Sequence, residues 1–257
     1  MTQSVEKLQH VRVLNANILS ITQEDLLRSL QEGVLITPNV DHLVKLQHDR
    51  GLYDCYQQAE WVVCDSRVLR LLSFLIGRPI RHVVAGSDFF PAYCQFHQHD
   101  ESCRIFVLGG LDDTAMDAQR NINQRAGRQL VVGACSPSLG FETNREECER
   151  IVEMINASGA STVLVGLGCP KQEKWIFDFK KQMPQVKVWM ALGATVDFEA
   201  GHTRRAPKVW RVLCMEWLHR FLHEPKRLYH RYWMEDMKFF VYLFKQLIGT
   251  YKNPFAE

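Results

Sequence analysis

Small and polar residues follow the apolar runs of this chain at the points where each run ends. These positions are Thr37 to Asn39, Asp65, Gly168 to Gln172, and Gly193 to Asp197. Small residues at such points let backbone N–H groups and helix N-termini approach an anion such as a diphosphate. The pattern therefore predicts a site for a nucleotide-like anion.

Six short apolar runs precede these polar residues and alternate with amphipathic stretches. The runs are Val34–Thr37, Trp61–Cys64, Arg104–Leu108, Leu130–Val132, Thr162–Val165 and Lys187–Ala191. Because they are apolar almost throughout, they predict strands that are buried on both faces. The alternation favours a Rossmann-like α/β fold, with a mostly parallel sheet and helices on both of its faces. Such sheets bind ligands at the carboxyl ends of their strands, where the polar residues stand.

Helices are expected between and after these strands. Residues 112–126 and 144–157 have helical patterns, and Thr143 with Glu146 predicts a capping box at the start of the second. After Pro207 the chain shows helical patterns without strands, over residues 208–222 and 225–248, and Pro225 suits a helix start. We therefore expect a catalytic core over residues 1–203 and a helical C-terminal appendage over residues 204–257.

The appendage is rich in basic and aromatic residues. From Arg204 to Arg231 there are eight Lys or Arg against two Glu, interleaved with Trp and other aromatic residues. Arginine binds phosphate oxygens through two parallel hydrogen bonds, and a basic helix with tryptophan suits an anionic lipid surface. The spacing of Arg220, Arg227 and Arg231 predicts that they share a helical face and bind a diphosphate. The alternative is a solvated basic face whose tryptophans pack on the core.

The composition excludes several protein classes. Hydrophobic residues make up 46% of the 257 residues, which argues against disorder, and a net charge of +2 argues against a nucleic-acid partner. The eight cysteines show no C-x-x-C spacing, so reduced core thiols are expected rather than a zinc site. The first residues lack a basic start followed by an apolar stretch. These features predict a cytoplasmic protein.

Sequence motifs argue against common cofactors. Gly166-Leu167-Gly168 continues with Cys169-Pro170-Lys171 rather than the G-x-G-x-x-G fingerprint of dinucleotide-binding folds, and no Walker lysine motif occurs. No D-x-D pair is present to hold a divalent metal through carboxylate oxygens. We expect no cofactor and a metal-independent site.

A set of ordered motifs resembles the WecG/TagA/CpsF glycosyltransferases. The motifs are Thr37-Pro38-Asn39 with Asp41-His42, Asp65, Gly86-Ser87-Asp88, Gly168 to Glu173, Arg204-Arg205-Ala206-Pro207, and Glu216-Trp217 with Arg220 and Glu224-Pro225. They extend over about residues 34–231. The chain differs from the family pattern at Ser66, where glycine is usual, and at Val83, where arginine is frequent.

The resemblance implies an inverting transfer of a sugar from a UDP-sugar to an undecaprenyl-diphosphate-linked saccharide, in the synthesis of a bacterial surface polysaccharide. It implies work at the cytoplasmic face of the inner membrane, with the appendage contacting that surface. Asp65 matches the family's proposed base, and Thr37 and Asn39 match positions that line the same pocket. The donor stays open among N-acetylmannosamine, N-acetylmannosaminuronic acid and glucose.

Each site residue also has a structural alternative. Asp65 and Asn39 suit helix caps, and Asp197 suits a buried turn as well as it suits uracil or ribose binding. Gln172 is expected to bind substrate, whereas Lys171 and Glu173 could simply decorate a first helical turn. A noncatalytic sugar-nucleotide or lipid-binding protein is the alternative function. An exposed apolar patch on the appendage would favour homo-oligomers.

Overall fold

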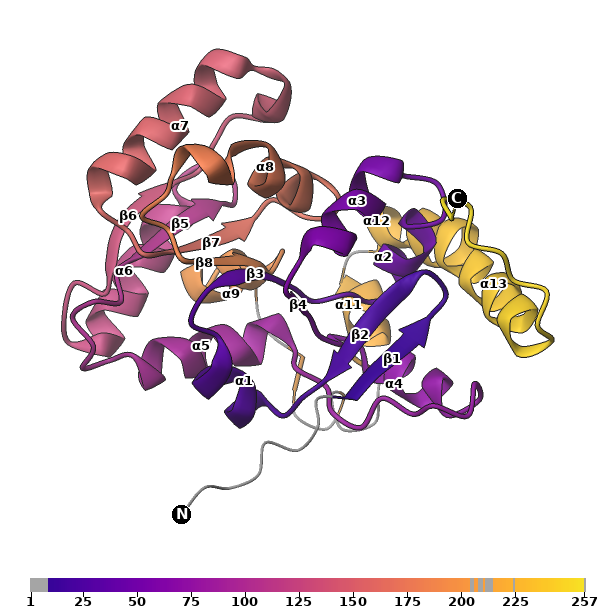
Figure 1. Cartoon of the computed structure of the whole chain (residues 1–257). Coiled ribbons are helices and arrows are strands. Elements are labelled where there is room, and N and C mark those ends of the chain that lie inside the picture. Colours follow the sequence, from indigo (N-terminus) through magenta and orange to yellow (C-terminus); the bar gives the residue numbers. More distant parts are fainter. Residues whose placement is uncertain (1–8, 204–205, 208–209, 211–214, 224, 257) are drawn as a thin grey trace.

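The six predicted strands form one parallel sheet, as the computed structural model shows (Figure 1). The structure describes residues 9–203, 206–207, 210, 215–223 and 225–256. The strand order is β4-β3-β8-β7-β5-β6, and every neighbouring pair is parallel. The strands are β3 (Gly33–Ile36), β4 (Trp61–Val62), β5 (Ile105–Gly109), β6 (Val131–Cys135), β7 (Thr162–Gly166) and β8 (Val188–Ala191).

Helices cover both faces of this sheet. Successive strand residues point to opposite sides, so both faces carry apolar side chains that the helices bury. In β7, Val163 and Val165 join one buried cluster and Leu164 joins the other. The first cluster is closed by α2 (Val40–Lys45), α3 (Arg50–Gln58), α4 (Arg67–Ser73), α7 (Arg145–Ser158) and α8 (Lys171–Phe179). The second is closed by α1 (Gln23–Ser29), α5 (Gly86–Phe96), α6 (Thr114–Ala126) and α9 (Thr195–Ala200). Short 3-10 turns, η1 (Phe141–Thr143) and η2 (Lys180–Gln182), precede α7 and follow α8.

An antiparallel hairpin precedes the sheet and was absent from the sequence-based expectation. It consists of β1 (Gln9–Val13) and β2 (Ala16–Ser20). Leu14 makes the turn with a φ of 54°. The side-chain amide of the neighbouring Asn15 donates to the Leu46 carbonyl at 2.8 Å. Leu19 bridges to Val63, which attaches the hairpin beside β4.

The helix starts are set by side-chain caps, and one predicted cap is wrong. Helix α7 is capped by Asn144, whose side chain accepts from the Glu147 amide at 3.2 Å, instead of by Thr143. Thr143 lies in the preceding 3-10 turn, where its hydroxyl donates to the Gly140 carbonyl. Helix α4 is capped by Ser66, which accepts from the Leu69 amide at 3.1 Å.

The C-terminal helices differ in detail from the two predicted ones. The described part of the first is α11 (Glu216–His223), and residues 208–209 and 211–214 lie outside the described ranges. The second starts at Pro225 as predicted, but it is divided into α12 (Pro225–Tyr229), a π-helical segment η3 (His230–Asp236) and α13 (Met237–Leu247). Within the part of the chain that the structure describes, no helix is both long and apolar enough to span a bilayer.

Helix α13 and the residues after it pack on the core. Phe239 and Leu243 are buried in the first cluster, and the Gln246 amide accepts from the Leu14 N–H at 2.8 Å. Beyond the helix, the Tyr251 hydroxyl donates to Gln47 at 2.7 Å. The contacts show that the end of the appendage packs on the core. A domain boundary between residues 203 and 204 stays a prediction.

Candidate active site

Asp65 lies at the carboxyl edge of the sheet and connects two neighbouring loops. Its backbone N–H donates to the Pro38 carbonyl at 3.0 Å, which joins the loops after β3 and β4. Its carboxylate oxygen Oδ1 accepts from the Gly86 N–H, at the first turn of α5, at 3.2 Å. Asp65 is half-buried, and Ser66 caps the helix that follows. The capping alternative for Asp65 is therefore wrong for α4, and the carboxylate faces the loop edge.

Gly86 brings the start of α5 against the loop after β8. A Cβ at this position would lie 3.2 Å from the Leu192 Cβ and 3.4 Å from the Thr195 hydroxyl. Any larger residue would therefore push α5 away from this loop. The Thr195 hydroxyl in turn donates to the Leu192 carbonyl at 2.8 Å, which fixes the start of α9.

Gln172 joins the loops after β7 and β8 from inside the protein. Its side-chain oxygen accepts from the Gly168 N–H at 3.2 Å and from the Gly193 N–H at 3.0 Å. Its side-chain nitrogen donates to Glu173 at 2.9 Å, and the residue is 1% exposed. Substrate binding by Gln172 stays a prediction. In this geometry the oxygen of its side-chain amide is hydrogen-bonded to both loops.

Glu173 is completely buried, so the prediction that it decorates an exposed helical turn is wrong. Its Oε2 is a buried atom without a hydrogen-bond partner among the described residues. Burial raises its pKa to about 7, although hydrogen bonds from Gln172 and Cys169 act in the opposite direction. The spacing to the buried Ile176, three residues later on α8, was the available signal that Glu173 faces inward.

A lysine ties α2 to the loop after β7. Lys45 donates to the Asp41 carboxylate at 2.9 Å and to the Cys169 carbonyl at 3.0 Å. Contacts run from Pro38 to Asp65, from Asp65 to Gly86, and on to Gly193 and Cys169. From Cys169 they return to α2. These contacts thus connect the loops after four strands into one ring. We call this set the loop ring: residues 37–39, 65, 86, 168–169 and 192–195.

The side chains of His42, Cys169 and Glu173 have the spacing of a possible metal site, since their donor atoms lie within 4.8 Å of one another. However, His42 Nδ1 is hydrogen-bonded to the Tyr56 hydroxyl at 2.8 Å. Burial also raises the pKa of the Cys169 thiol well above its usual range. We assign no metal to this buried cluster.

The other predicted pocket residues lie on or beside the loop ring. Thr37 is buried at the end of β3, and the Asn39 side chain accepts from the His42 N–H at 3.3 Å, so Asn39 caps α2. Asp197 lies half-buried in the first turn of α9, where its carbonyl accepts from the His202 N–H at 3.1 Å. The structural alternative therefore holds for Asn39, and ligand binding by Thr37, Asn39 and Asp197 stays a prediction.

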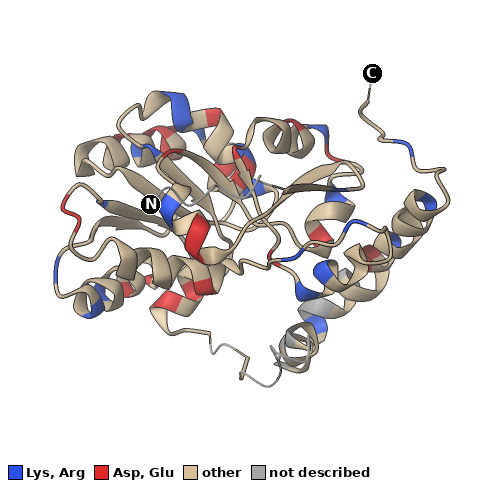
Figure 2. Cartoon of the chain, turned by 60° about the horizontal axis from the view of Figure 1, so that its bottom comes forward, with Lys and Arg blue, Asp and Glu red and all other residues tan. Residues whose placement is uncertain are grey.

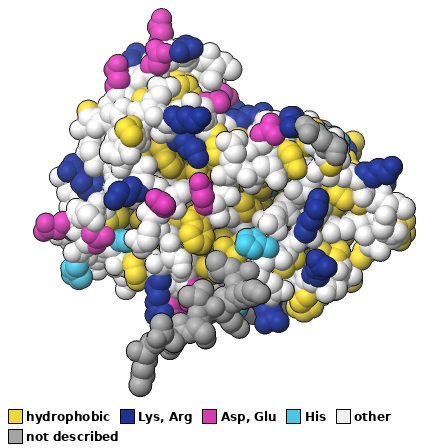
Figure 3. All heavy atoms as spheres, viewed as in Figure 1, with side chains coloured by type: hydrophobic (Ala, Val, Ile, Leu, Met, Phe, Trp, Pro, Cys, Tyr) yellow, Lys and Arg dark blue, Asp and Glu magenta, His cyan; other side chains and the backbone are white. Residues whose placement is uncertain are grey.

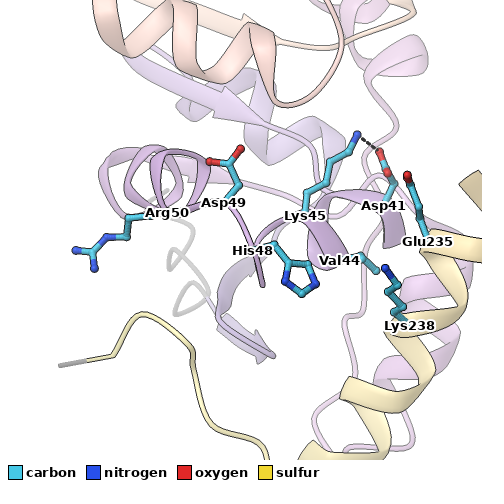
Figure 4. Close-up of a pocket in the computed structure, with 8 residues that line it drawn as sticks. All are labelled: Asp41, Val44, Lys45, His48, Asp49, Arg50, Glu235 and Lys238. Carbon is cyan, nitrogen blue, oxygen red and sulfur yellow. Dashed lines mark hydrogen bonds and ion pairs between the residues drawn. The ribbon is translucent and has the colours of Figure 1, made fainter.

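A cleft of about 390 Å³ separates α2 and α3 from the C-terminal helices (Figure 4). Asp41, Lys45, His48 and Arg50 line one side, and Glu235 and Lys238 line the other. Segment η3 contacts α2 directly, and the Tyr242 hydroxyl pairs with His48 at 3.0 Å. The C-terminal helices thus reach the helix that starts at the loop ring.

Arg220, Arg227 and Arg231 lie in α11, α12 and η3, but their side chains are outside the described part of the structure. Diphosphate binding by these three arginines stays a prediction. Figure 2 shows other Lys and Arg residues along the C-terminal helices, and Lys226, Lys238 and Lys245 are all exposed there.

Large apolar side chains are exposed on the same side of the molecule. On α13, Phe240, Val241 and Phe244 are 45%, 56% and 60% exposed, opposite the buried Phe239 and Leu243. On α4, the exposed residues include Leu71 and, directly after the helix, Phe74 and Leu75. Leu75 and Leu247 line one shallow pocket, so the two groups adjoin. Figure 3 shows hydrophobic and basic side chains interspersed on this side.

The family assignment follows from a comparison that covers nearly the whole described fold. A model of the glycosyl transferase WecG/TagA/CpsF family matches residues 11–253, from the β1–β2 hairpin to the segment after α13. The match includes every strand of the parallel sheet, the loop ring and the C-terminal helices. The chain therefore belongs to the glycosyl transferase WecG/TagA/CpsF family.

Proposed function

We propose that the protein transfers a hexosyl or N-acetylhexosaminyl group from a UDP-sugar to a polyprenyl-diphosphate-linked saccharide, with inversion at the anomeric carbon. The observation that carries this proposal is the position of Asp65. Its carboxylate lies at the carboxyl edge of a parallel sheet, where such folds bind ligands, and the residue is hydrogen-bonded to Pro38 and Gly86 of the loop ring. Family membership supports a sugar-nucleotide donor and a saccharide acceptor.

In this mechanism one carboxylate is enough. Asp65 takes the proton from the acceptor hydroxyl while the hydroxyl oxygen forms its bond to the anomeric carbon, and the bond to the UDP oxygen breaks on the opposite face. The hydrogen bond from the Gly86 N–H to Oδ1 orients the Asp65 carboxylate. Thr37, Asn39 and Asp197 supply polar groups for the sugars at the same edge.

The diphosphates need cations, and the C-terminal helices supply them in this proposal. Arg220, Arg227 and Arg231 would bind the lipid diphosphate and the leaving UDP through bidentate hydrogen bonds. The exposed apolar residues of α4 and α13 would rest on the cytoplasmic face of the inner membrane, where the acceptor's polyprenyl chain is held. No cofactor and no metal ion takes part in the proposed reaction.

The test is sugar transfer from a panel of UDP-sugars to a short-chain polyprenyl-diphosphate saccharide, with EDTA present, for the wild-type protein and Asp65→Asn. We expect the variant to lose roughly 10²- to 10⁴-fold in kcat, the usual contribution of a general base. The matched control is Asp113→Asn, an exposed aspartate after β5 at the same sheet edge, which should keep wild-type activity.

Three other outcomes would change the proposal. Undiminished transfer by Asp65→Asn would remove Asp65 as the base. Transfer that EDTA abolishes would show a metal-dependent reaction. A folded protein that binds UDP but transfers sugar from no donor would favour the noncatalytic sugar-nucleotide or lipid-binding protein.

A further inference from the structure

We infer that Glu173 is a positioning residue for the transfer reaction: it fixes the orientation of the Gln172 amide and thereby holds the loops after β7 and β8 in register. The inference uses the proposed function for its activity test only. Glu173 itself has no exposed surface and cannot contact a substrate in this structure.

The orientation of the Gln172 amide matters because the two ends of the amide group are opposite in hydrogen bonding. Its oxygen accepts from the N–H groups of Gly168 and Gly193. An amide rotated by half a turn would place its own N–H donors against these two backbone donors, and both loops would lose their common acceptor. Something must therefore select one orientation.

Glu173 makes that selection. Its Oε1 accepts from the Gln172 side-chain nitrogen at 2.9 Å, and a carboxylate in this place cannot donate to the amide oxygen instead. A proton on Oε2, the atom without a partner, leaves Oε1 an acceptor. The ionised carboxylate and the form protonated on Oε2 both keep Oε1 as an acceptor. Both forms therefore favour the same orientation of the Gln172 amide.

Charged and titratable neighbours surround Glu173. From α2, His42 Nδ1 lies 4.0 Å from Oε1, and Lys45 acts on the carboxylate from the same helix. Tyr56 of α3 bonds to His42, and the Cys169 thiol of the β7 loop donates toward Glu173. The Gln172 amide and the Cys169 thiol are the side chains hydrogen-bonded to the Glu173 carboxyl.

The first experiment reads the loops directly and does not depend on activity. The protein has 15 glycines, so a sample labelled with ¹⁵N only at glycine gives a simple amide spectrum. In Glu173→Leu, which keeps the volume but removes the acceptor, the Gly168 and Gly193 N–H signals should shift and exchange with solvent faster. In Glu173→Gln, which can keep an acceptor oxygen, both signals should stay near their wild-type positions.

The matched control is Glu199→Leu. Glu199 is also buried, but it pairs with Arg125 on the other face of the sheet. This variant should leave Gly168 and Gly193 unchanged. Unchanged Gly168 and Gly193 signals in Glu173→Leu, or equal changes in both leucine variants, would overturn the inference.

The second experiment is a double-mutant cycle on transfer activity with Gln172→Leu and Glu173→Leu. If Glu173 acts through Gln172, each single variant should lower kcat by roughly 10- to 100-fold. This is the usual cost of displacing the groups of an active site by about 1 Å. The double variant should then be no slower than Gln172→Leu alone. Additive losses would show that Glu173 acts independently of Gln172 and would contradict the inference. If the wild-type protein transfers no sugar, the proposed function fails, while the glycine spectra still decide the role of Glu173.

Discussion

The ionisation of Glu173 links a buried residue of the site to stability. Its pKa is raised from 4.5 to about 7 in the folded protein because burial disfavours the charged form. Below pH 4.5 the group is neutral in both the folded and the unfolded state. As the pH rises toward 7, the unfolded chain ionises first, so the folded state loses roughly 3 kcal/mol of relative stability.

Glu173→Gln removes this ionisation and should therefore become more stable relative to the wild type as the pH rises. Between pH 5 and pH 8 we expect the difference in unfolding free energy to change by roughly 2–3 kcal/mol in favour of the variant. Urea unfolding at several pH values measures it. A difference that stays constant over this range would mean that Glu173 ionises near its ordinary pKa in the folded protein.

The sequence indicated which polar residues stand at the ends of the strands. It did not indicate which of these residues cap a helix and which accept from a distant loop. Asn39 and Ser66 show why, because both follow strands and both cap helices. Asp65 has the same sequence context, yet its carboxylate accepts from Gly86, 21 residues later. Local patterns contain no information on such distant partners. The inward direction of Glu173 was missed for another reason, since its spacing to Ile176 on α8 did indicate it.

At the scale of elements, the close approach of α5 to the β8 loop depends on Gly86. In Gly86→Ala the new Cβ would lie 3.2 Å from both the Cβ and the Cδ2 of Leu192, a buried residue. We expect a loss of about 1–3 kcal/mol in unfolding free energy, the usual cost of overpacking. The start of α5 should also move away from Asp65 and lower kcat.

Gly51→Ala is the matched control for this prediction, since Gly51 also lies in the first turn of a helix. Its new Cβ would meet the flexible end of Lys174 at 3.2 Å and the Asp49 carboxylate at 3.5 Å. Because alanine is a better helix former than glycine, this variant should be neutral or slightly more stable. Denaturant unfolding and transfer assays compare the two. Equal effects of both changes would show that the contact between α5 and Leu192 does not constrain the site.

The central strands β5, β7 and β8 were predictable as elements because they are buried and apolar almost throughout. The hairpin was harder to predict, since only alternate residues such as Val11 and Val13 are buried in β1. The π-helical segment His230–Asp236 has no sequence signal of its own, because its residues suit an α-helix equally well.

At the scale of the whole molecule, α13 is apolar on two opposite sides. One side, with Phe239 and Leu243, is buried in the core, and the other, with Phe240 and Phe244, is exposed. Leu247 near the end of α13 and Leu75 after α4 line one shallow pocket. Monomeric proteins rarely leave large apolar patches uncovered. Exposed lysines on α12 and α13 favour an anionic surface as its partner.

We therefore expect the protein to bind vesicles that contain phosphatidylglycerol and to bind phosphatidylcholine vesicles less well. Phe74→Ser and Phe244→Ser each remove one exposed ring, from α4 and from α13. Each should weaken vesicle binding by about tenfold or more, because burying such a side chain contributes ~1.5–3 kcal/mol. Activity on a soluble short-chain acceptor should stay unchanged, since neither ring lies on the loop ring.

Met154→Ser is the control for vesicle binding, because Met154 is 45% exposed on α7, which lies far from α13 (Figure 1). Sedimentation with vesicles compares the three variants with the wild type. If Phe74→Ser and Phe244→Ser bind vesicles as well as Met154→Ser does, this face does not meet the membrane. If they also convert a concentration-dependent oligomer to a monomer, the face joins two copies of the chain, and the lipid acceptor must reach Asp65 by another side.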